Sequence, residues 1–262
     1  MAQVRLVSFS DGSRVVIKTV DGAPAGMFRA EADGLAALAA TGCLATPDVL
    51  GVNDRMLVLV ALAPREDSER SWETFARDLA ALHSGTVQDR FGWPADGYLG
   101  RVVQRNPGTA SGHEFFARHR VLRYLGEPGV QRELTSADRR ALERFCERLP
   151  EIIPEMPPVL THGDLWPGNM LGRDDGRIAV IDPAVSWAWA EVDLSMLWCC
   201  QRPPVSRRFF DVYQEINPSP AGWAERMPLL HVRELLSSIA HIGDGEGEVP
   251  RLRRVLAPFY RR

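Results

Sequence analysis

The sequence is nearly free of lysine, poor in cysteine and without any long apolar run. Lys18 is the only lysine, so every other basic residue is arginine. The four cysteines have neither CxxC spacing nor Cys/His ligand spacing, and we expect buried thiols. The longest apolar run, residues 56–63, is far shorter than the roughly 20 residues that cross a bilayer. The start of the chain also has no apolar signal core, so we expect a cytoplasmic protein without a membrane partner.

Strong net charge is lacking as well. The 31 basic and 34 acidic side chains leave a formal charge of −3, which is too balanced for a typical nucleic-acid binder. With 45% hydrophobic and 25% charged residues, the 262-residue chain has the composition of an ordinary globular protein. No internal repeat or low-complexity tract is visible. The length fits one large domain or two lobes.

The first 63 residues read as a small sheet that carries one helix. Residues 3–20 form two β-rich runs around Asp11-Gly12, which predicts a hairpin. Helical periodicity follows over residues 27–40, and strand character returns over residues 46–63. In the helix we expect an apolar stripe with Glu31 at its edge; the stripe contains Phe28, Ala32, Leu35 and Ala39, and Leu38 also lies at its edge.

From residue 64 onward the pattern is mainly helical. Amphipathic stretches cover residues 71–84, 113–126 and 135–153. Apolar strand-like segments interrupt them once, at residues 158–182, and helices resume from about Val192. We therefore predict an α+β protein with an N-terminal lobe at 1–63 and a larger helical lobe at 64–262.

The densest group of chemically active residues lies inside that interruption. His162, Asp164 and Asn169 form an H-x-D-x₄-N pattern, and Asp182 follows the apolar strand RIAVI. A two-residue turn at Asp175-Gly176 would place Asn169 opposite Asp182, with Cβ atoms roughly 4.5–5.5 Å apart. Amide and carboxylate oxygens suit Mg²⁺. Asp164 could take a hydroxyl proton. The alternative is that these residues only satisfy a tight loop and a strand end.

This pattern resembles the catalytic and metal-binding loops of the protein-kinase-like fold. HGDLWPGN (162–169), followed by DPA (182–184), is most similar to the fructosamine (ketosamine) kinases, a family within the aminoglycoside phosphotransferase-like kinases. FGWP (91–94) and EFFARHRV (114–121) extend the similarity, which covers most of the chain from about Asp11 onward. The resemblance implies a two-lobed kinase-like fold.

The resemblance also implies roles for five side chains. Asp164 would accept or orient the substrate hydroxyl, while Asn169 and Asp182 would hold Mg²⁺ on the phosphates of ATP. Lys18 looks like the sheet lysine that contacts the α- and β-phosphates, and Glu31 looks like its ion-pair partner. The use of a compact ammonium only once, on an apolar strand, fits such a role.

The nucleotide site carries one further expectation and one departure from the family. Leu59, Val60 and Ala61 would form the hinge between the lobes and offer backbone groups to adenine. The family usually has a glycine-containing loop over the phosphates, whereas only ten residues precede Asp11-Gly12. Either the start of the sequence lies further upstream or phosphate cover comes from elsewhere. His162 is expected to bond loop backbone instead of acting as a base.

The activity implied by the resemblance is transfer of the γ-phosphoryl group of ATP to a sugar hydroxyl of a ketosamine, with deglycation repair as its biology. The family often has tryptophan where this chain has NPGTASGH (106–113), so another hydroxylated amine, aminoglycoside-like or choline-like, stays an alternative acceptor. Asp96 and Glu114 are candidates for acidic residues facing a cationic acceptor. A nucleotide-binding pseudokinase and a metal-dependent phosphoester hydrolase are the remaining alternatives.

Overall fold

The computed structural model describes residues 2–261 and consists of two compact units. One unit takes the described chain up to Thr86 together with His162–Val185 and Cys200–Pro218. The other contains Val87–Thr161, Ser186–Cys199 and the chain from Ser219 onward. Several elements that follow residue 63 thus group with the N-terminal sheet. The lobe boundary at residues 63/64 stays a prediction.

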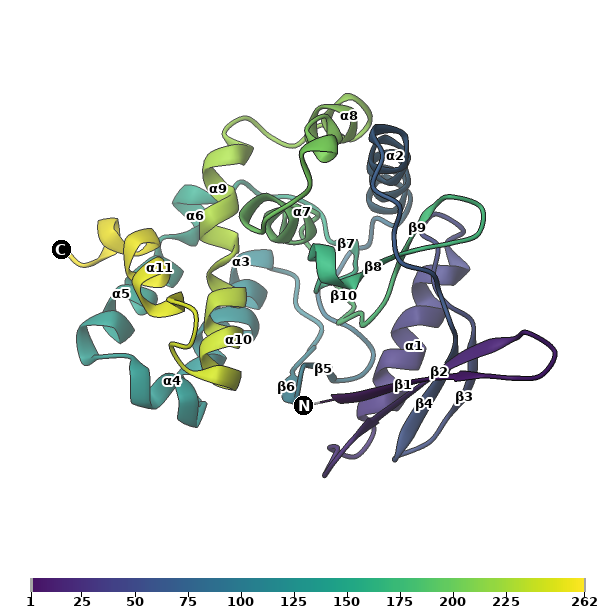
Figure 1. Ribbon diagram of the computed structural model, residues 1–262. Coiled ribbons are helices and arrows are strands. Elements are labelled where there is room, and N and C mark those ends of the chain that lie inside the picture. Colours follow the sequence, from purple (N-terminus) through teal and green to yellow (C-terminus); the bar gives the residue numbers. More distant parts are fainter. Residues whose placement is uncertain (1, 262) are drawn as a thin grey trace. The chain divides into compact units, whose positions relative to one another are not determined.

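The first unit is built on a four-stranded antiparallel sheet (Figure 1). Its strands are β1 (Ala2–Ser8), β2 (Arg14–Val20), β3 (Val49–Val52) and β4 (Met56–Val60), in the order β1-β2-β4-β3. The predicted hairpin is present, because β1 pairs with β2 and Ser8 faces Arg14 across a turn that contains Gly12. A φ of 85° at Gly12 explains the glycine in that turn.

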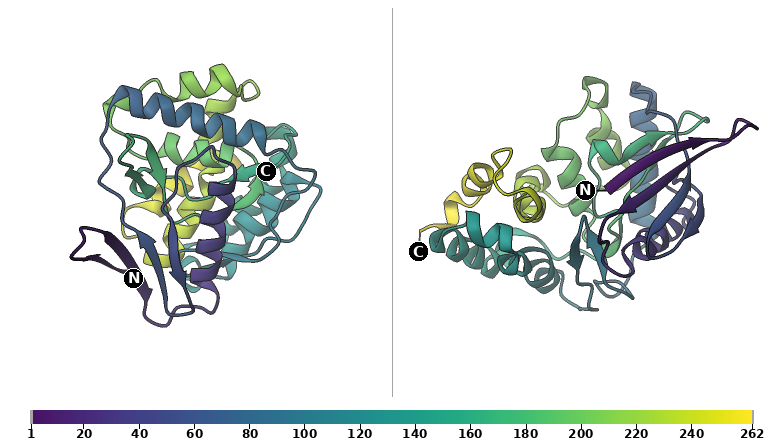
Figure 2. Two further views of the ribbon diagram at one scale, coloured as in Figure 1. Left: turned by 90° about the vertical axis from the view of Figure 1, so that its right-hand side faces the viewer. Right: turned by 60° about the horizontal axis from the view of Figure 1, so that its bottom comes forward.

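Helix α1 (Met27–Ala40) lies along this sheet in both orientations of the molecule (Figures 1 and 2). The helix has the predicted bounds, but its buried face differs from the predicted stripe. Glu31 and Leu38 are buried within that face, whereas Ala39 is exposed. The stripe follows i, i+3 and i+4 steps from Phe28, and a charged residue can sit within it because Lys18 supplies a partner.

The remaining elements of this unit bind the predicted catalytic segment to the N-terminal sheet region. They are α2 (Glu69–Gly85), η3 (Pro167–Asn169), β8 (Met170–Gly172), β9 (Ile178–Val180), η4 (Pro204–Ser206) and α8 (Phe209–Ile216). Single β-bridges join Ala45 to Ala179 and Ala63 to Gly172. The Arg177 guanidinium also pairs with Asp78 of α2 at 2.9 Å. These contacts place the hairpin β8–β9 in the same compact unit as Lys18.

The second unit is mainly helical, as the sequence predicts. Its strands pair as β5 (Gly97–Leu99) with β6 (Val102–Gln104) and β7 (Val159–Thr161) with β10 (Ser186–Ala188). Its helices are α3 (Gly112–Phe116), η1 (Ala117–Val121), η2 (Leu122–Gly126), α4 (Pro128–Glu133), α5 (Ser136–Glu147), α6 (Leu149–Ile152), α7 (Glu191–Cys199), α9 (Trp223–Leu230), α10 (Val232–Ile242), α11 (Glu248–Val255) and η5 (Ala257–Phe259). The stretch predicted as one helix over 113–126 passes from α-helical to π-helical and 3₁₀ geometry.

Two further features of the structure concern membrane-spanning helices and cysteines. Within residues 2–261, no helix is both long and apolar enough to cross a membrane. All four cysteines are free thiols. Only Cys146 is buried, and burial raises the pKa of its thiol to about 12; the other three are half-buried, so the expectation of four buried thiols was wrong.

Candidate active site

The hairpin β8–β9 has a different register from the predicted one. Met170 faces Val180 and Gly172 faces Ile178, so the turn has three residues between the closing pair Arg173 and Arg177. Gly176 has a φ of 79°, which is the left-handed position of a three-residue loop with a glycine bulge. The predicted two-residue turn at Asp175-Gly176 was therefore wrong by one residue.

This register moves Asp182 out of the position opposite Asn169. The amide N–H of Ile181 donates to the carbonyl of Asn169 at 3.0 Å, so Ile181 is the residue that faces Asn169. Asp182 comes next, with a φ of 55°; it is the only non-glycine residue with positive φ within residues 2–261. A side chain in this region costs conformational energy, which marks Asp182 as a constrained position at the end of the strand.

Asn169 instead bonds directly to Asp164. Its side-chain Nδ2 donates to the Asp164 carbonyl at 2.9 Å and to Asp164 Oδ2 at 3.0 Å. These two bonds fix the orientation of the amide. Because both use Nδ2, the amide oxygen Oδ1 is not bonded to Asp164. Asn169 is buried, so the pair sits on an ordered loop. The structure thus brings the predicted catalytic carboxylate and one predicted metal ligand into contact.

His162 bonds the backbone on both sides of this loop, as expected. The N–H of Asp164 donates to Nδ1 at 3.2 Å, so Nε2 carries the ring proton and donates it to the Ile181 carbonyl at 3.0 Å. The N–H of Ala184 donates to the His162 carbonyl at 2.9 Å. His162 therefore connects the Asp164 loop to the segment that carries Asp182.

Lys18 lies between two carboxylates. Its Nζ is 2.7 Å from Glu31 Oε2 and 2.8 Å from Asp182 Oδ1. The Lys18 and Glu31 side chains are each only 9% exposed, whereas Asp182 is 40% exposed. The sequence predicts the Lys18–Glu31 pair but not the contact with Asp182. The buried ammonium of Lys18 is thus paired with Glu31 of α1 and also with the more accessible carboxylate of Asp182, which follows β9.

Burial sets the electrostatics of this cluster. Burial alone would lower the pKa of Lys18, but the charges of Glu31 and Asp182 outweigh it and raise the pKa above its usual value. For Glu31, burial and the nearby Asp182 charge outweigh the attraction of Lys18 and raise the pKa to about 7. One ammonium therefore serves two carboxylates, and an additional cation beside Asp182 would relieve the surplus negative charge.

The three predicted hinge residues lie at the end of β4 and just beyond it. The N–H of Val60 donates to the Asp48 carbonyl at 2.9 Å, and the N–H of Ala61 donates to the Arg14 carbonyl at 3.0 Å. Leu59 is buried in the sheet. Two of the backbone donors expected to meet adenine are thus already engaged within the protein. The adenine contact of Leu59, Val60 and Ala61 stays a prediction.

Arg65 is a positioning residue that the sequence argument missed. Its Nη1 donates to the carbonyls of Pro167 and Met170, at 2.9 and 3.2 Å, on either side of Asn169. Asp67 holds the same guanidinium through Nε at 2.7 Å, and the group lies 5.1 Å from the centre of the buried Trp72 ring. Nothing in the sequence marks Arg65 among 30 arginines, because its role depends on contacts more than one hundred residues away.

The donor chemistry of these residues fits a magnesium–phosphate group. Within the described chain, no three His, Cys, Asp or Glu side chains gather in a group that could hold a metal ion. Mg²⁺ typically takes one or two protein oxygens and completes its shell with phosphates and water. Asp182 supplies an accessible carboxylate, Asn169 an oriented amide, and Lys18 an ammonium for phosphate oxygens.

Comparison with known proteins identifies similar sequences and a similar solved structure. The sequence profile of the fructosamine kinase family matches residues 2–253. A Synechocystis protein named "Probable ketoamine kinase" is 32% identical over 232 residues, which cover 84% of this chain and 74% of the relative. A crystal structure of a Thermobifida fusca protein, assigned as a fructosamine-3-kinase, superposes with a TM-score of 0.86 at 33% identity and covers 98% of this chain and 93% of that one.

A solved structure of lower sequence identity is also similar in fold. Choline kinase from Streptococcus pneumoniae has a TM-score of 0.64 at 15% identity, with 98% of this chain and 90% of that chain covered. At this identity the similarity concerns the fold alone. Together with the small antiparallel sheet and the mainly helical remainder, it confirms the predicted kinase-like α+β fold.

Proposed function

The chain belongs to the fructosamine kinase family, and from that premise we propose that it transfers the γ-phosphoryl group of ATP to a sugar hydroxyl of a ketosamine. The observation that carries the proposal is the Lys18–Glu31–Asp182 cluster in one compact unit with the Asp164–Asn169 pair. Phosphoryl transfer asks a protein mainly to position groups and neutralise charge. A cationic side chain, two candidate metal ligands and a fixed carboxylate meet that requirement.

Each residue has a defined part in this mechanism. The Lys18 ammonium binds phosphate oxygens, and Glu31 keeps that ammonium in place on the sheet. Asp182 and Asn169 would hold Mg²⁺, which supplies neutralisation of the phosphate charge when it is bound. Binding of the ion would compete with Lys18 for Asp182, so the half-exposed carboxylate is the group expected to move. Asp164, oriented by the Asn169 amide, accepts the proton of the attacking hydroxyl.

The test is ADP release from ATP in the presence of Mg²⁺ with four acceptors: ribulosyl-lysine, fructosyl-lysine, an aminoglycoside and choline. We expect turnover with a ketosamine and a loss of about 10²- to 10⁴-fold in kcat for Asp164→Asn. Asp174→Asn, which changes an exposed carboxylate in the nearby β8–β9 turn, is the matched control and should keep full activity.

The other outcomes separate the alternatives. Turnover with only the aminoglycoside or choline would keep the mechanism and replace the acceptor class. Absence of turnover with all four acceptors, in folded protein that binds ATP, would contradict the proposal and support a nucleotide-binding pseudokinase.

A further inference from the structure

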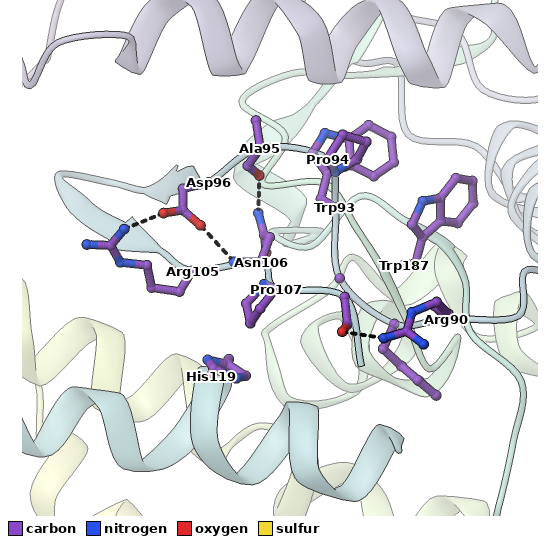
Figure 3. Close-up of a pocket in the computed structure, with 13 residues that line it drawn as sticks. Arg90, Trp93, Pro94, Ala95, Asp96, Arg105, Asn106, Pro107, His119 and Trp187 are labelled. Carbon is purple, nitrogen blue, oxygen red and sulfur yellow. Dashed lines mark hydrogen bonds and ion pairs between the residues drawn. The ribbon is translucent and has the colours of Figure 1, made fainter. Parts of the chain in front are cut away.

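The second compact unit contains a pocket whose lining includes none of the residues assigned above to phosphoryl transfer. It has a volume of about 900 Å³, within the range of small-molecule sites. Residues 90–96 form one side, residues 105–108 another, and His119 and Trp187 complete the lining (Figure 3). Every lining residue belongs to this unit, so the pocket is complete without Lys18, Asp164, Asn169 or Asp182.

Aromatic rings form one wall of the pocket. The indoles of Trp93 and Trp187 lie with their centres 5.3 Å apart and their planes inclined at 44°. Both side chains are half-buried, so part of each ring faces the pocket. The backbone holds the two segments together, because Gly92 and Trp187 exchange hydrogen bonds at 3.0 and 2.7 Å. A preformed aromatic wall of this kind favours a flat, partly apolar ring.

Polar groups stand at both ends of this wall. Figure 3 shows the Asp96–Arg105 pair at one side of the pocket and Arg90 beside Trp187 at the other. Asp96 and Arg105 are joined at 2.5 Å, which gives a paired acceptor and donor. Arg90 donates to the Gly108 carbonyl at 2.7 Å and has no carboxylate partner within the described chain. The pocket therefore offers a hydrogen-bonding pair at one end and a surplus positive charge at the other.

The polar end is rigid because buried groups hold it. Asp96 Oδ1 accepts the N–H of Asn106 at 3.0 Å, and the Asn106 side chain donates to the Ala95 carbonyl at 3.0 Å. Arg120, which is buried, donates to Asn106 Oδ1 at 2.6 Å and to the Arg105 carbonyl at 2.9 Å. Burial, with the Arg120 charge next in weight, lowers the pKa of His119, which favours the neutral form of this ring. The unbalanced cation is Arg90.

We propose that this pocket binds a sugar phosphate, with the sugar ring on Trp93 and Trp187, ring hydroxyls on Asp96 and Arg105, and the phosphate on Arg90. The guanidinium geometry suits a phosphate, since two of its N–H groups can donate in parallel. The aromatic wall suits the apolar face of the ring, and the Asp96–Arg105 pair can both accept from and donate to hydroxyls. Binding needs no ATP, so the inference is independent of the proposed reaction.

Isothermal titration calorimetry without nucleotide tests this assignment, with fructose 6-phosphate, fructose and inorganic phosphate as probes. We expect fructose 6-phosphate to bind more tightly than either of the other two. Arg90→Gln should weaken fructose 6-phosphate binding about tenfold and leave fructose binding unchanged. Trp93→Leu should weaken both, by up to about tenfold.

Two control variants keep the test specific. Arg118→Gln removes an exposed arginine of the same unit, and Trp198→Leu removes a partly exposed tryptophan outside the pocket; neither should change binding. Phosphate binding as tight as that of fructose 6-phosphate would overturn the ring site, and equal affinity for fructose would overturn the phosphate assignment. No binding of fructose 6-phosphate at millimolar concentration to the folded protein would overturn the whole proposal.

Discussion

Two glycines with the same backbone angle allow a sharp test of the candidate active site. Gly163 and Gly176 both have a φ of 79°. A Cβ atom added at Gly163 would lie 2.2 Å from the carbonyl oxygen of Ala184, whereas one added at Gly176 would meet nothing within 4 Å. Alanine at either position thus carries the same left-handed strain, and only the change at Gly163 also forces a collision.

The two substitutions should therefore differ in stability and in activity. Left-handed strain costs roughly 1–2 kcal/mol at each position. The collision must open the contact by about 1 Å, and overpacking of this kind typically adds about 1–3 kcal/mol. We expect Gly176→Ala to lower the free energy of unfolding by about 1–2 kcal/mol and Gly163→Ala by about 2–5 kcal/mol, so that Gly163→Ala is the more destabilising change by about 1–3 kcal/mol.

Activity should separate the pair further. Gly163 precedes Asp164, and the Ala184 carbonyl lies two residues beyond Asp182, so the collision pushes apart the two segments that carry these carboxylates. A displacement of about 1 Å can cost on the order of 10² in rate. We expect about that loss in kcat for Gly163→Ala and normal kcat for Gly176→Ala, measured by ADP release beside urea unfolding. Equal stability and equal kcat in the two variants would refute the reasoning.

Three more outcomes follow from contacts described above or from burial. Lys18→Met should destabilise the fold by about 3 kcal/mol, whereas Glu31→Gln should cost only about 1–2 kcal/mol, because in that variant Lys18 still has Asp182 as its ion-pair partner. In urea unfolding the double variant should cost less than the sum of the two single variants, and additive costs would contradict the buried pair. Arg65→Gln should lower kcat about tenfold and weaken Mn²⁺ binding, seen by electron paramagnetic resonance in the presence of nucleotide, while Arg173→Gln, an exposed control, should change neither. Burial, then neighbouring arginine charges, lowers the pKa of His231 from 6.5 to about 4. Between these pH values the unfolded chain binds one proton more than the folded chain, so the free energy of unfolding decreases as the pH falls. The loss approaches about 3 kcal/mol at pH 4, and His231→Gln should remove it from unfolding curves measured across this pH range.

Local sequence signals predicted the elements of the N-terminal sheet well. The hairpin around Gly12 and the bounds of α1 follow from short-range turn chemistry and helical periodicity, both of which can be read from neighbouring residues. The inward placement of Glu31 was harder to predict, because it depends on a lysine thirteen residues away on another element. A helix stripe alone gives no reason to bury a carboxylate.

Register and long-range anchors limited the prediction of the site. A change from a two-residue to a three-residue turn shifts every later partner by one, and Asp175-Gly176 is compatible with both. The contact of Asp182 with Lys18 depends on the positive φ after β9, which no sequence pattern announced. The sequence did not predict the role of Arg65, because that role depends on a contact with the Pro167 carbonyl, which lies far away in the sequence.

The single lysine gives this protein an unusual chemical property. Apart from the α-amino group of the chain, Lys18 Nζ is the only primary amine in the sequence, and it lies in the Lys18–Glu31–Asp182 cluster. Reductive methylation with ¹³C-formaldehyde would therefore place one side-chain label in the whole molecule, without mutagenesis. The chemical shift of the label on Lys18 would follow the state of the neighbouring Glu31 and Asp182 carboxylates. A composition almost empty of lysine thus supplies a spectroscopic reporter inside the candidate active site.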